Sequence, residues 1–352
     1  MIGSLQDTHK PAPGSTRTAT STTTVTTADP AAHPATHSAA EAVVGSAAAR
    51  SDFFEQPVPR RYVHRASVAE VLLTGFAEDS RPDTFLLAAQ WPRGHSFYRT
   101  ARGVHDPLLF AETVRQAGLL ISHLGYKVPL AHAALMRNLS YDVTAPGLAC
   151  AGTPTNLILS ASCADVRFRK DVLVGFTITT VLRRGLELEP VGIGRGELQC
   201  ISPAAYRRLR GGAGAVSPPT EAAPLPEPVS PALVGKDGRA DVVLSRTESD
   251  DTWLLRCDTA HPVLFDHPVD HVPGMALIEA MRQAAHCMLY PQRTAMVRLR
   301  ATFERYVELS EPTAVRAIIE GTEADGAVRV RVELTQSGRQ VAVGWCSCRS
   351  LA

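Results

Sequence analysis

The hydrophobic pattern of this chain changes between a two-residue period and a helical period, and it does so in both halves. Between Val328 and Leu334 apolar and charged residues alternate strictly, and a looser alternation runs from Val172 to Ile178. A period of two is typical of strands with one buried face. Elsewhere apolar residues recur at spacings of three and four, which predicts one amphipathic helix in each half. The two apolar stripes are Phe110, Val114, Ala117 and Ile121, and Leu277, Met281, Ala284 and Met288.

Several strands are expected to follow each helix, and a short strand with a loop to precede it. The predicted strands cover residues 134–141, 156–162, 164–169, 171–183 and 192–201 in the first half, and 295–306, 313–320, 327–335 and 339–349 in the second. One helix beside a long antiparallel sheet is an α+β arrangement. A helix wrapped by such a sheet is the hot-dog fold, so the pattern predicts a tandem, or double, hot-dog fold.

The two halves also match residue by residue. Residues 105–117 read HDPLLFAETVRQA and residues 271–284 read HVPGMALIEAMRQA, with one extra residue between the proline and the glutamate of the second copy. The surroundings repeat as well, because Phe85 and His95 are mirrored by Trp253 and His261. Like units of this kind can bury surface against each other. We therefore interpret the chain as a tandem duplication.

Composition divides the chain into four parts. Residues 1–50 are rich in Ser, Thr, Ala and Pro and hold few large apolar side chains, so we expect a disordered tail. Residues 211–239 contain paired glycines and several prolines, which predicts a semi-extended linker. The N-terminal hot-dog domain is then expected over residues 51–210, and the C-terminal hot-dog domain over residues 240–352.

The charge and the cysteines argue against several classes of protein. A formal net charge of +1 over 352 residues disfavours nucleic acid and anionic membranes as partners, and no apolar run is long enough to span a bilayer. The N-terminus lacks the basic start and apolar core of a secretory signal. The seven cysteines include no C-x-x-C pair. We expect reduced thiols in a cytoplasmic protein.

Both predicted helices carry the polar motif Glu-x-x-Arg-Gln-Ala. Its residues fall on one stripe of each helix: Glu112, Arg115 and Gln116 in the first, and Glu279, Arg282 and Gln283, followed by His286, in the second. On many amphipathic helices such a pair is an ordinary exposed ion pair. The recurrence of the motif favours a functional role, although shared ancestry alone would also produce it. The sequence leaves both interpretations open.

The loop before the second helix is the other candidate for chemistry. It contains Asp266, His267, Asp270 and His271 and leads through a proline into Gly274. Free N–H groups in the first turn of a helix can polarise an acyl carbonyl. Ligation of a metal by the four polar residues is disfavoured, because no confirming cluster occurs elsewhere, and we expect no metal. Histidines beside helix starts are also often caps or packed rings.

These motifs resemble the A-factor biosynthesis family, whose members make γ-butyrolactone signalling molecules in filamentous actinobacteria. The resemblance extends from about Phe54 to Arg349, and its most specific segments are residues 91–98 (WPRGHSFY), 105–118 and 265–286. It implies an acyltransferase that moves a β-ketoacyl group from acyl carrier protein to the hydroxyl of dihydroxyacetone phosphate. No cofactor is implied.

The resemblance also implies a site. The first catalytic candidates are Glu279 and Arg282, and the second are Glu112 and Arg115. The glutamate would act as a base with a raised pKa, and the arginine would fix a phosphate or the thioester oxygen. The proline and glycine that lead into the C-terminal helix favour this helix as the catalytic one. Candidate substrate-binding residues are His267, His271, Gly274, Gln283, His105 and Gln116, and the acyl channel is expected beside Phe110, Leu277 and Met281.

Rival interpretations remain. A weaker similarity links the chain to hot-dog 3-hydroxyacyl-thioester dehydratases, in which a histidine loop precedes a comparable helix. That loop is longer there, so His267 is only an approximate counterpart. A thioesterase, or a catalytically silent binder of acyl ligands, would also suit the fold, whereas a DNA-binding regulator would not. Either a monomeric double hot dog or a homodimer is expected.

Overall fold

The computed structural model describes residues 42, 45, 50, 52–211 and 225–351. The tail predicted over residues 1–50 lies almost wholly outside the described residues, as does the first part of the predicted linker. Within the described part, each half has short strands, then one long helix and then four long strands, in the order that the hydrophobic pattern predicts. No helix there is both long and apolar enough to cross a membrane.

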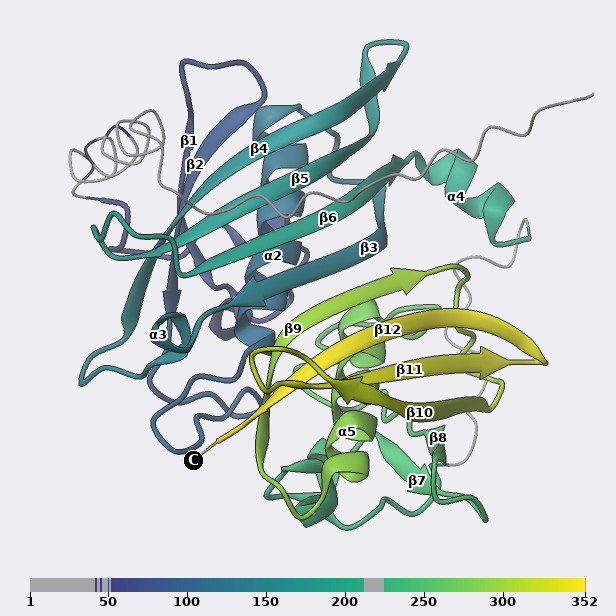
Figure 1. The fold of residues 1–352 in the computed structure, drawn as a ribbon. Coiled ribbons are helices and arrows are strands. Elements are labelled where there is room, and N and C mark those ends of the chain that lie inside the picture. Colours follow the sequence, from purple (N-terminus) through teal and green to yellow (C-terminus); the bar gives the residue numbers. More distant parts are fainter. Residues whose placement is uncertain (1–41, 43–44, 46–49, 51, 212–224, 352) are drawn as a thin grey trace, which may run out of the picture.

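Twelve strands of the described residues form a single sheet (Figure 1). The first half contributes β1 (Leu73–Glu78), β2 (Thr84–Trp91), β3 (Ala133–Val143), β4 (Thr155–Arg169), β5 (Val172–Arg184) and β6 (Gly192–Ile201). The second half contributes β7 (Leu244–Arg246), β8 (Thr252–Leu255), β9 (Thr294–Phe303), β10 (Thr313–Thr322), β11 (Val328–Gln336) and β12 (Arg339–Ser350).

The strand order confirms the duplication. It runs β1-β2-β4-β5-β6-β3 in the first half and β9-β12-β11-β10-β8-β7 in the second, so each half repeats the same topology in reverse. The halves meet where β3 pairs with β9, antiparallel, from Asn138 opposite Thr302 to Asp142 opposite Arg298. An antiparallel pair of equivalent strands relates two units by an approximate twofold axis. The double hot dog is therefore one continuous sheet.

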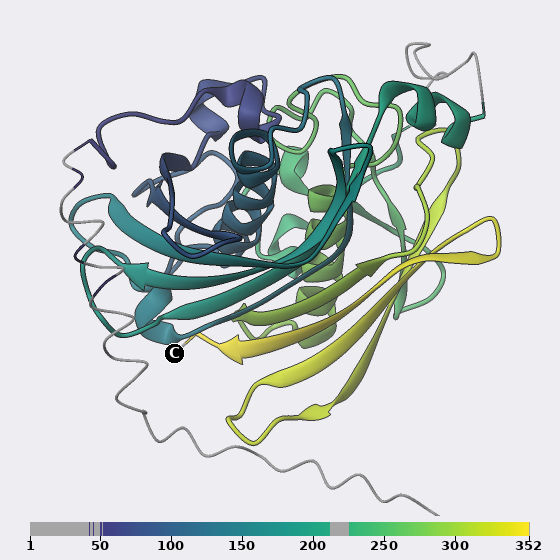
Figure 2. The ribbon, with the colours of Figure 1, turned by 90° about the horizontal axis from the view of Figure 1, so that it is seen from above.

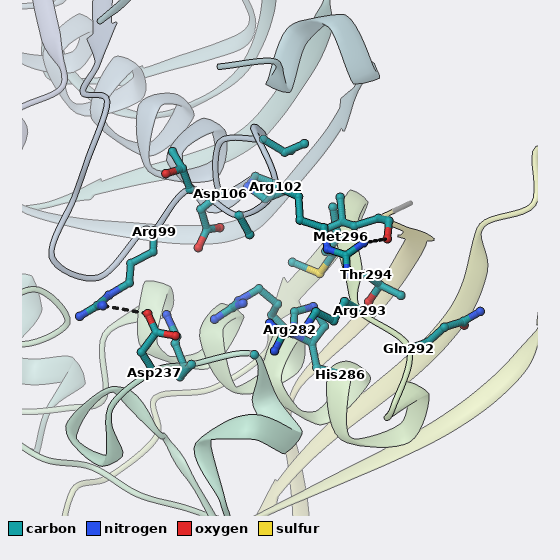
Figure 3. Close-up of a pocket in the computed structure, with 18 of the residues that line it drawn as sticks. Arg99, Arg102, Asp106, Asp237, Arg282, His286, Gln292, Arg293, Thr294 and Met296 are labelled. Atoms are coloured by element: carbon teal, nitrogen blue, oxygen red, sulfur yellow. Dashed lines mark hydrogen bonds and ion pairs between the residues drawn. The ribbon is translucent and has the colours of Figure 1, made fainter. Parts of the chain in front are cut away.

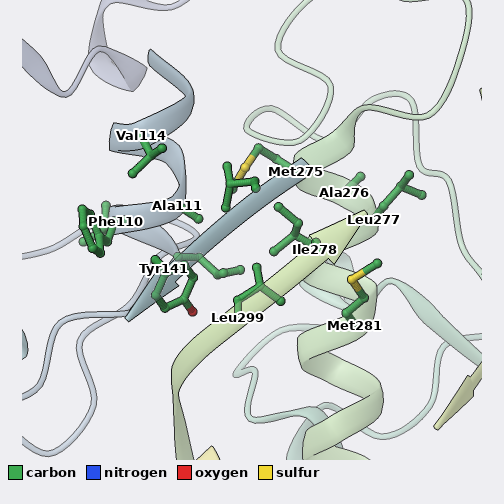
Figure 4. Packing of buried hydrophobic residues seen from close by; sticks show 14 of the residues in the cluster. Phe110, Ala111, Val114, Tyr141, Met275, Ala276, Leu277, Ile278, Met281 and Leu299 are labelled. Carbon is green, nitrogen blue, oxygen red and sulfur yellow. The ribbon is translucent and has the colours of Figure 1, made fainter. Parts of the chain in front are cut away.

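Two central helices occupy the concave face of this sheet (Figure 2). They are α2 (Leu108–Leu120), which continues into a π-turn over Ile121–Gly125, and α5 (Gly274–Leu289). Their apolar side chains and those of β3 and β9 form a common core (Figure 4). The other helical segments are short: α3 (Ala145–Leu148), α4 (Pro203–Leu209) and single turns at Arg60–Val63, Val68–Glu70, Pro231–Val234 and Arg239–Asp241.

Two strand predictions were wrong in detail. The break predicted after residue 162 does not exist, because β4 continues through it with an irregular register between Ala164 and Arg167 and with Asp165 at a positive φ of 52°. A local bulge interrupts alternation without ending a strand. Each half also opens with two paired strands rather than the single strand predicted. The sequence pattern does not show the first strand of either half, because β1 contains a glycine and β7 has only three residues.

The predicted acyl channel is only partly present. Phe110 and Met281 are completely buried and line neither of the two cavities described below, whereas Leu277 lines one of them. Glycines in the sheet make room for the two buried side chains. A Cβ on Gly192 would lie 2.9 Å from the Phe110 ring, and a Cβ on Gly344 would lie 2.5 Å from the Met281 sulfur. Phe110 and Met281 are thus core residues.

Such close packing predicts a position-specific effect within β6. A methyl group at Gly194 would collide with a Val114 methyl and lie 2.8 Å from the Thr180 hydroxyl, and both neighbours are stiff β-branched side chains. We expect Gly194→Ala to lower the free energy of unfolding by about 1–3 kcal/mol, measured by urea denaturation. Gly196→Ala is the matched control, because its nearest atom lies 3.5 Å away. Equal effects at both positions would contradict this packing argument.

Candidate active site

The Glu-x-x-Arg-Gln motif of α5 is a buried cluster rather than an exposed ion pair. Glu279 is 0% exposed and accepts hydrogen bonds from both Nε (3.0 Å) and Nη2 of Arg282 and from the amide of Gln283 at 2.6 Å. A second cation, Lys236, places its Nζ 3.4 Å from the same carboxylate. Burial of a charge is tolerated only with such pairing.

The first half repeats the cluster on α2. Glu112 accepts from Arg115 at 2.8 and 2.7 Å and from the amide of Gln116 at 2.7 Å. Here the second cation is Arg65, whose Nη2 lies 2.8 Å from the carboxylate. Each half therefore holds one buried carboxylate between two cations. The interpretation as an ordinary surface pair is wrong for both helices.

This surrounding reverses the expected direction of the glutamate pKa. Burial by itself opposes ionisation, but the adjacent guanidinium and second cation outweigh it and lower the pKa of Glu279 and of Glu112 to about 2. A carboxylate of this kind is a poor proton acceptor at neutral pH. The prediction of a general base with a raised pKa is therefore wrong for both glutamates.

The two motif glutamines hold the helices in place. Oε1 of Gln116 accepts from the backbone N–H of Leu72 at 2.9 Å, and Oε1 of Gln283 accepts from that of Val243 at 2.9 Å. Each amide NH₂ donates to its own motif glutamate and to a backbone carbonyl before β1 or β7. Both side chains are fully buried and line neither cavity. Their predicted role in substrate binding is a structural role instead.

The second cation of each cluster also joins the two halves. Lys236 Nζ donates to the carbonyl of Phe97 at 3.1 Å, and Arg65 Nη1 donates to the carbonyl of Val263 at 2.9 Å. Lys236 lies in the predicted linker, yet it is 7% exposed and belongs to the site. Sequence reasoning missed both cations, because their contacts are long-range.

One cavity, of about 550 Å³, opens beside Arg282 (Figure 3). It lies between the loop before α2, which contributes His105 and Asp106, and the C-terminal part of α5. Its charged lining among the described residues has more cations than carboxylates: Arg99, Arg102, Lys236, Arg282 and Arg293 against Asp106 and Asp237, of which Asp237 pairs with Arg99 at 2.8 Å. We call it the basic cavity. Such a surface suits an anionic substrate.

A second cavity, of about 230 Å³, opens beside Arg115. Its lining includes His267 and His271 from the loop before α5, and Gly274 from the first turn of that helix. Most of the remaining lining is apolar: Leu119, Leu135, Met136, Leu198, Leu264, Phe265, Met275, Leu277, Ile278 and Phe303. We call it the apolar cavity.

The structure thus combines the predicted site residues differently from the expectation. The loop and first turn of α5, with Gly274, face Arg115 of the other half, whereas Arg282 faces the loop before α2. Eight residues of helix separate Gly274 from Arg282, a rise of about 12 Å. The candidate residues therefore line two cavities instead of one. The proline and glycine at the start of α5 lie at a different cavity from Arg282.

The three candidate histidines have different surroundings. His105 is 1% exposed, contacts the Thr155 hydroxyl through Nε2 at 3.0 Å, and its pKa is lowered by burial. His267 and His271 instead pair through Nδ1 with the aspartates that precede them, at 2.5 and 2.7 Å. In the described residues no group of three or more His, Cys, Asp or Glu side chains is arranged to hold a metal ion.

Comparison with known proteins agrees with the resemblance. The model of the A-factor biosynthesis hotdog domain matches residues 46–201 and 218–352. A protein named 2-oxo-3-(phosphooxy)propyl 3-oxoalkanoate synthase from Streptomyces virginiae is 42% identical over 78% of this chain and 92% of its own length. Proteins of the same name from Streptomyces coelicolor and Streptomyces griseus are 37% and 36% identical over 86% and 81% of this chain, and over 96% and 93% of their own lengths. The chain belongs to the A-factor biosynthesis hotdog family.

Proposed function

We propose that this protein is a 2-oxo-3-(phosphooxy)propyl 3-oxoalkanoate synthase. It transfers a β-ketoacyl group from a thioester to the hydroxyl of dihydroxyacetone phosphate, which gives a phosphorylated β-keto ester, the precursor of a γ-butyrolactone-type signal. Relatives of that name, aligned over most of both chains, support the reaction. The observation that carries the assignment of the site is the Glu279–Arg282 pair beside the basic cavity.

The basic cavity suits the two anionic features of this reaction. Arg282 is 5% exposed and is held in a fixed orientation by Glu279, so its planar fork is preorganised for the oxygen of the thioester carbonyl as negative charge develops on it. Arg99, Arg102 and Arg293 are exposed at the cavity and suit the phosphate. Glu279 positions Arg282 and does not exchange a proton.

The donor and the setting are part of the same proposal. Acyl carrier protein is the donor expected from the resemblance, and free thiols at all seven cysteines fit a cytoplasmic location. Because β3 and β9 pair within one chain, each half hydrogen-bonds the exposed sheet edge of the other. We therefore expect a monomer. Glu112 and Arg115, beside the smaller apolar cavity, are the second-choice catalytic pair.

An acceptor-dependence assay tests the reaction. Purified protein is incubated with a β-ketoacyl thioester with and without dihydroxyacetone phosphate, while thiol release is followed and the products are identified by mass spectrometry. The phosphate ester should form, and thiol release should depend on the acceptor. Thiol release of equal rate without acceptor would instead support a thioesterase, and loss of water from a 3-hydroxyacyl thioester would support a dehydratase.

A further inference from the structure

The proposed reaction needs a proton acceptor, and Glu279 does not meet that need. A hydroxyl attacks a thioester efficiently only if a base takes its proton in the transition state. Both oxygens of Glu279 are engaged by Arg282, Lys236 and Gln283, and the side chain is inaccessible. The base must therefore be another group at the basic cavity.

His286 has the geometry of such a base. It lies one turn after Arg282 on α5 and lines the same cavity (Figure 3). Its Nδ1 lies 3.2 Å from the carbonyl oxygen of Val234. A carbonyl can only accept, so Nδ1 carries the proton and Nε2 carries a lone pair. That Nε2 is buried and has no hydrogen-bond partner in the structure.

The neighbouring backbone is shaped around this ring. Gly235 has a φ of +69°, and a Cβ at this position would lie 3.0 Å from His286 Nδ1. A side chain there would push the imidazole away from Val234 and change the direction of Nε2. The glycine thus permits the left-handed turn, and it leaves room for the imidazole ring next to the backbone.

We propose that His286 is the catalytic base of the basic cavity, an inference that rests on the proposed function. Nε2 takes the hydroxyl proton of dihydroxyacetone phosphate as the oxygen forms a bond to the thioester carbonyl carbon. The tetrahedral intermediate then breaks its C–S bond, and the departing sulfur takes the proton from the imidazolium. One ester and one thiol form from one alcohol and one thioester, without any further reactant.

In the protein without substrate the ring is neutral, so its lone pair is available, but it is a weak base. Burial, followed by the positive charge of Arg282, lowers the pKa of His286 to about 3, so the imidazole is neutral at pH 7. Glu279 and the carbonyl of Val234 act in the opposite direction, and Lys236 acts in the same direction as Arg282. A phosphate dianion bound in the cavity would raise the pKa and strengthen the base.

The other half has no histidine at the equivalent helix position, and the histidines of its apolar cavity, His64, His267 and His271, come from other segments. Alignment of the two Glu-x-x-Arg-Gln motifs places Leu119 opposite His286, and Leu119 lines the apolar cavity beside Arg115. His105 also lines the basic cavity, but its contact is a hydroxyl, which can donate or accept and leaves the tautomer open. At the basic cavity the structure therefore favours His286 over His105.

Replacement of His286 by asparagine tests the proposal, because the asparagine amide can keep the hydrogen bond to Val234 while Nε2 is lost. We expect kcat to fall at least about 100-fold, with the KM for dihydroxyacetone phosphate changed by less than about threefold. The assay uses the full chain, dihydroxyacetone phosphate and a β-ketoacyl N-acetylcysteamine thioester. Thermal unfolding, followed by circular dichroism, should match the wild type within a few degrees.

His132→Asn is the matched control. Its Nδ1 is also buried without a partner, but His132 lines neither cavity, so its kcat should stay near the wild-type value. If His286→Asn keeps its kcat, or if only His105→Asn loses it, the assignment of His286 is overturned while the proposed function stands. A wild-type protein that forms no phosphate ester would overturn the proposed function itself.

Discussion

We expect the Arg282→Lys variant to remain folded and to lose about 100-fold in kcat/KM, the size of effect seen when one donor to a developing oxyanion is removed. Lysine keeps a positive charge beside Glu279, so the buried carboxylate stays neutralised. It cannot reproduce the planar fork, which donates twice to Glu279 while the same side chain lines the basic cavity. Steady-state thiol release in the presence of dihydroxyacetone phosphate measures the loss.

The same substitution in the other half is the internal control. Arg115 occupies the equivalent position, binds Glu112 in the same way and is the more exposed of the two arginines. Because the apolar cavity lacks a histidine at the position of Leu119, we expect Arg115→Lys to keep kcat/KM within about threefold of the wild type. A large loss in Arg115→Lys with little change in Arg282→Lys would move the reacting site to the apolar cavity.

The architecture follows from local information in the sequence. Strict alternation along β11 and apolar stripes at helical spacing on α2 and α5 each report which side of one element is buried. The repeat adds long-range information, because equivalent segments must occupy equivalent places. It extends to His95 and His261, whose Nδ1 atoms each accept two backbone N–H groups of the following turn.

The assembly of the site could not be predicted in this way. Which helix end faces which arginine is decided by the antiparallel pairing of β3 with β9, and nothing local to either helix reports that pairing. The second cations are equally hidden. Arg65 precedes the first strand and Lys236 lies in a proline-rich stretch, and each contacts its glutamate only after the chain has folded. The sequence predicts a raised pKa for Glu279 and Glu112 for the same reason, because the second cation that lowers each pKa is not visible in the local sequence.

Those second cations lead to the largest expected effect on stability. Glu279→Gln would leave Arg282 and Lys236 buried without a counter-charge, and loss of one partner of a buried pair costs about 3–5 kcal/mol. The pH dependence follows from the lowered pKa values. Because Glu279 and Glu112 titrate lower in the folded state, at about 2, than the ordinary value of 4.5, their contribution is complete above pH 4.5 and is lost as the pH falls towards 2.

Urea unfolding at pH 7 and at several values below pH 4.5 measures both effects. Wild-type stability should fall steeply in the acid range, whereas Glu279→Gln should start lower at pH 7 and fall less steeply, because one of the carboxylates with a lowered pKa is gone. Glu78→Gln is the control, since the side chain of Glu78 is 61% exposed and its Lys127 contact is a loose 3.9 Å; exposed pairs contribute at most about 1 kcal/mol. An acid slope that is the same in wild type and Glu279→Gln would refute the buried ion pair as its origin.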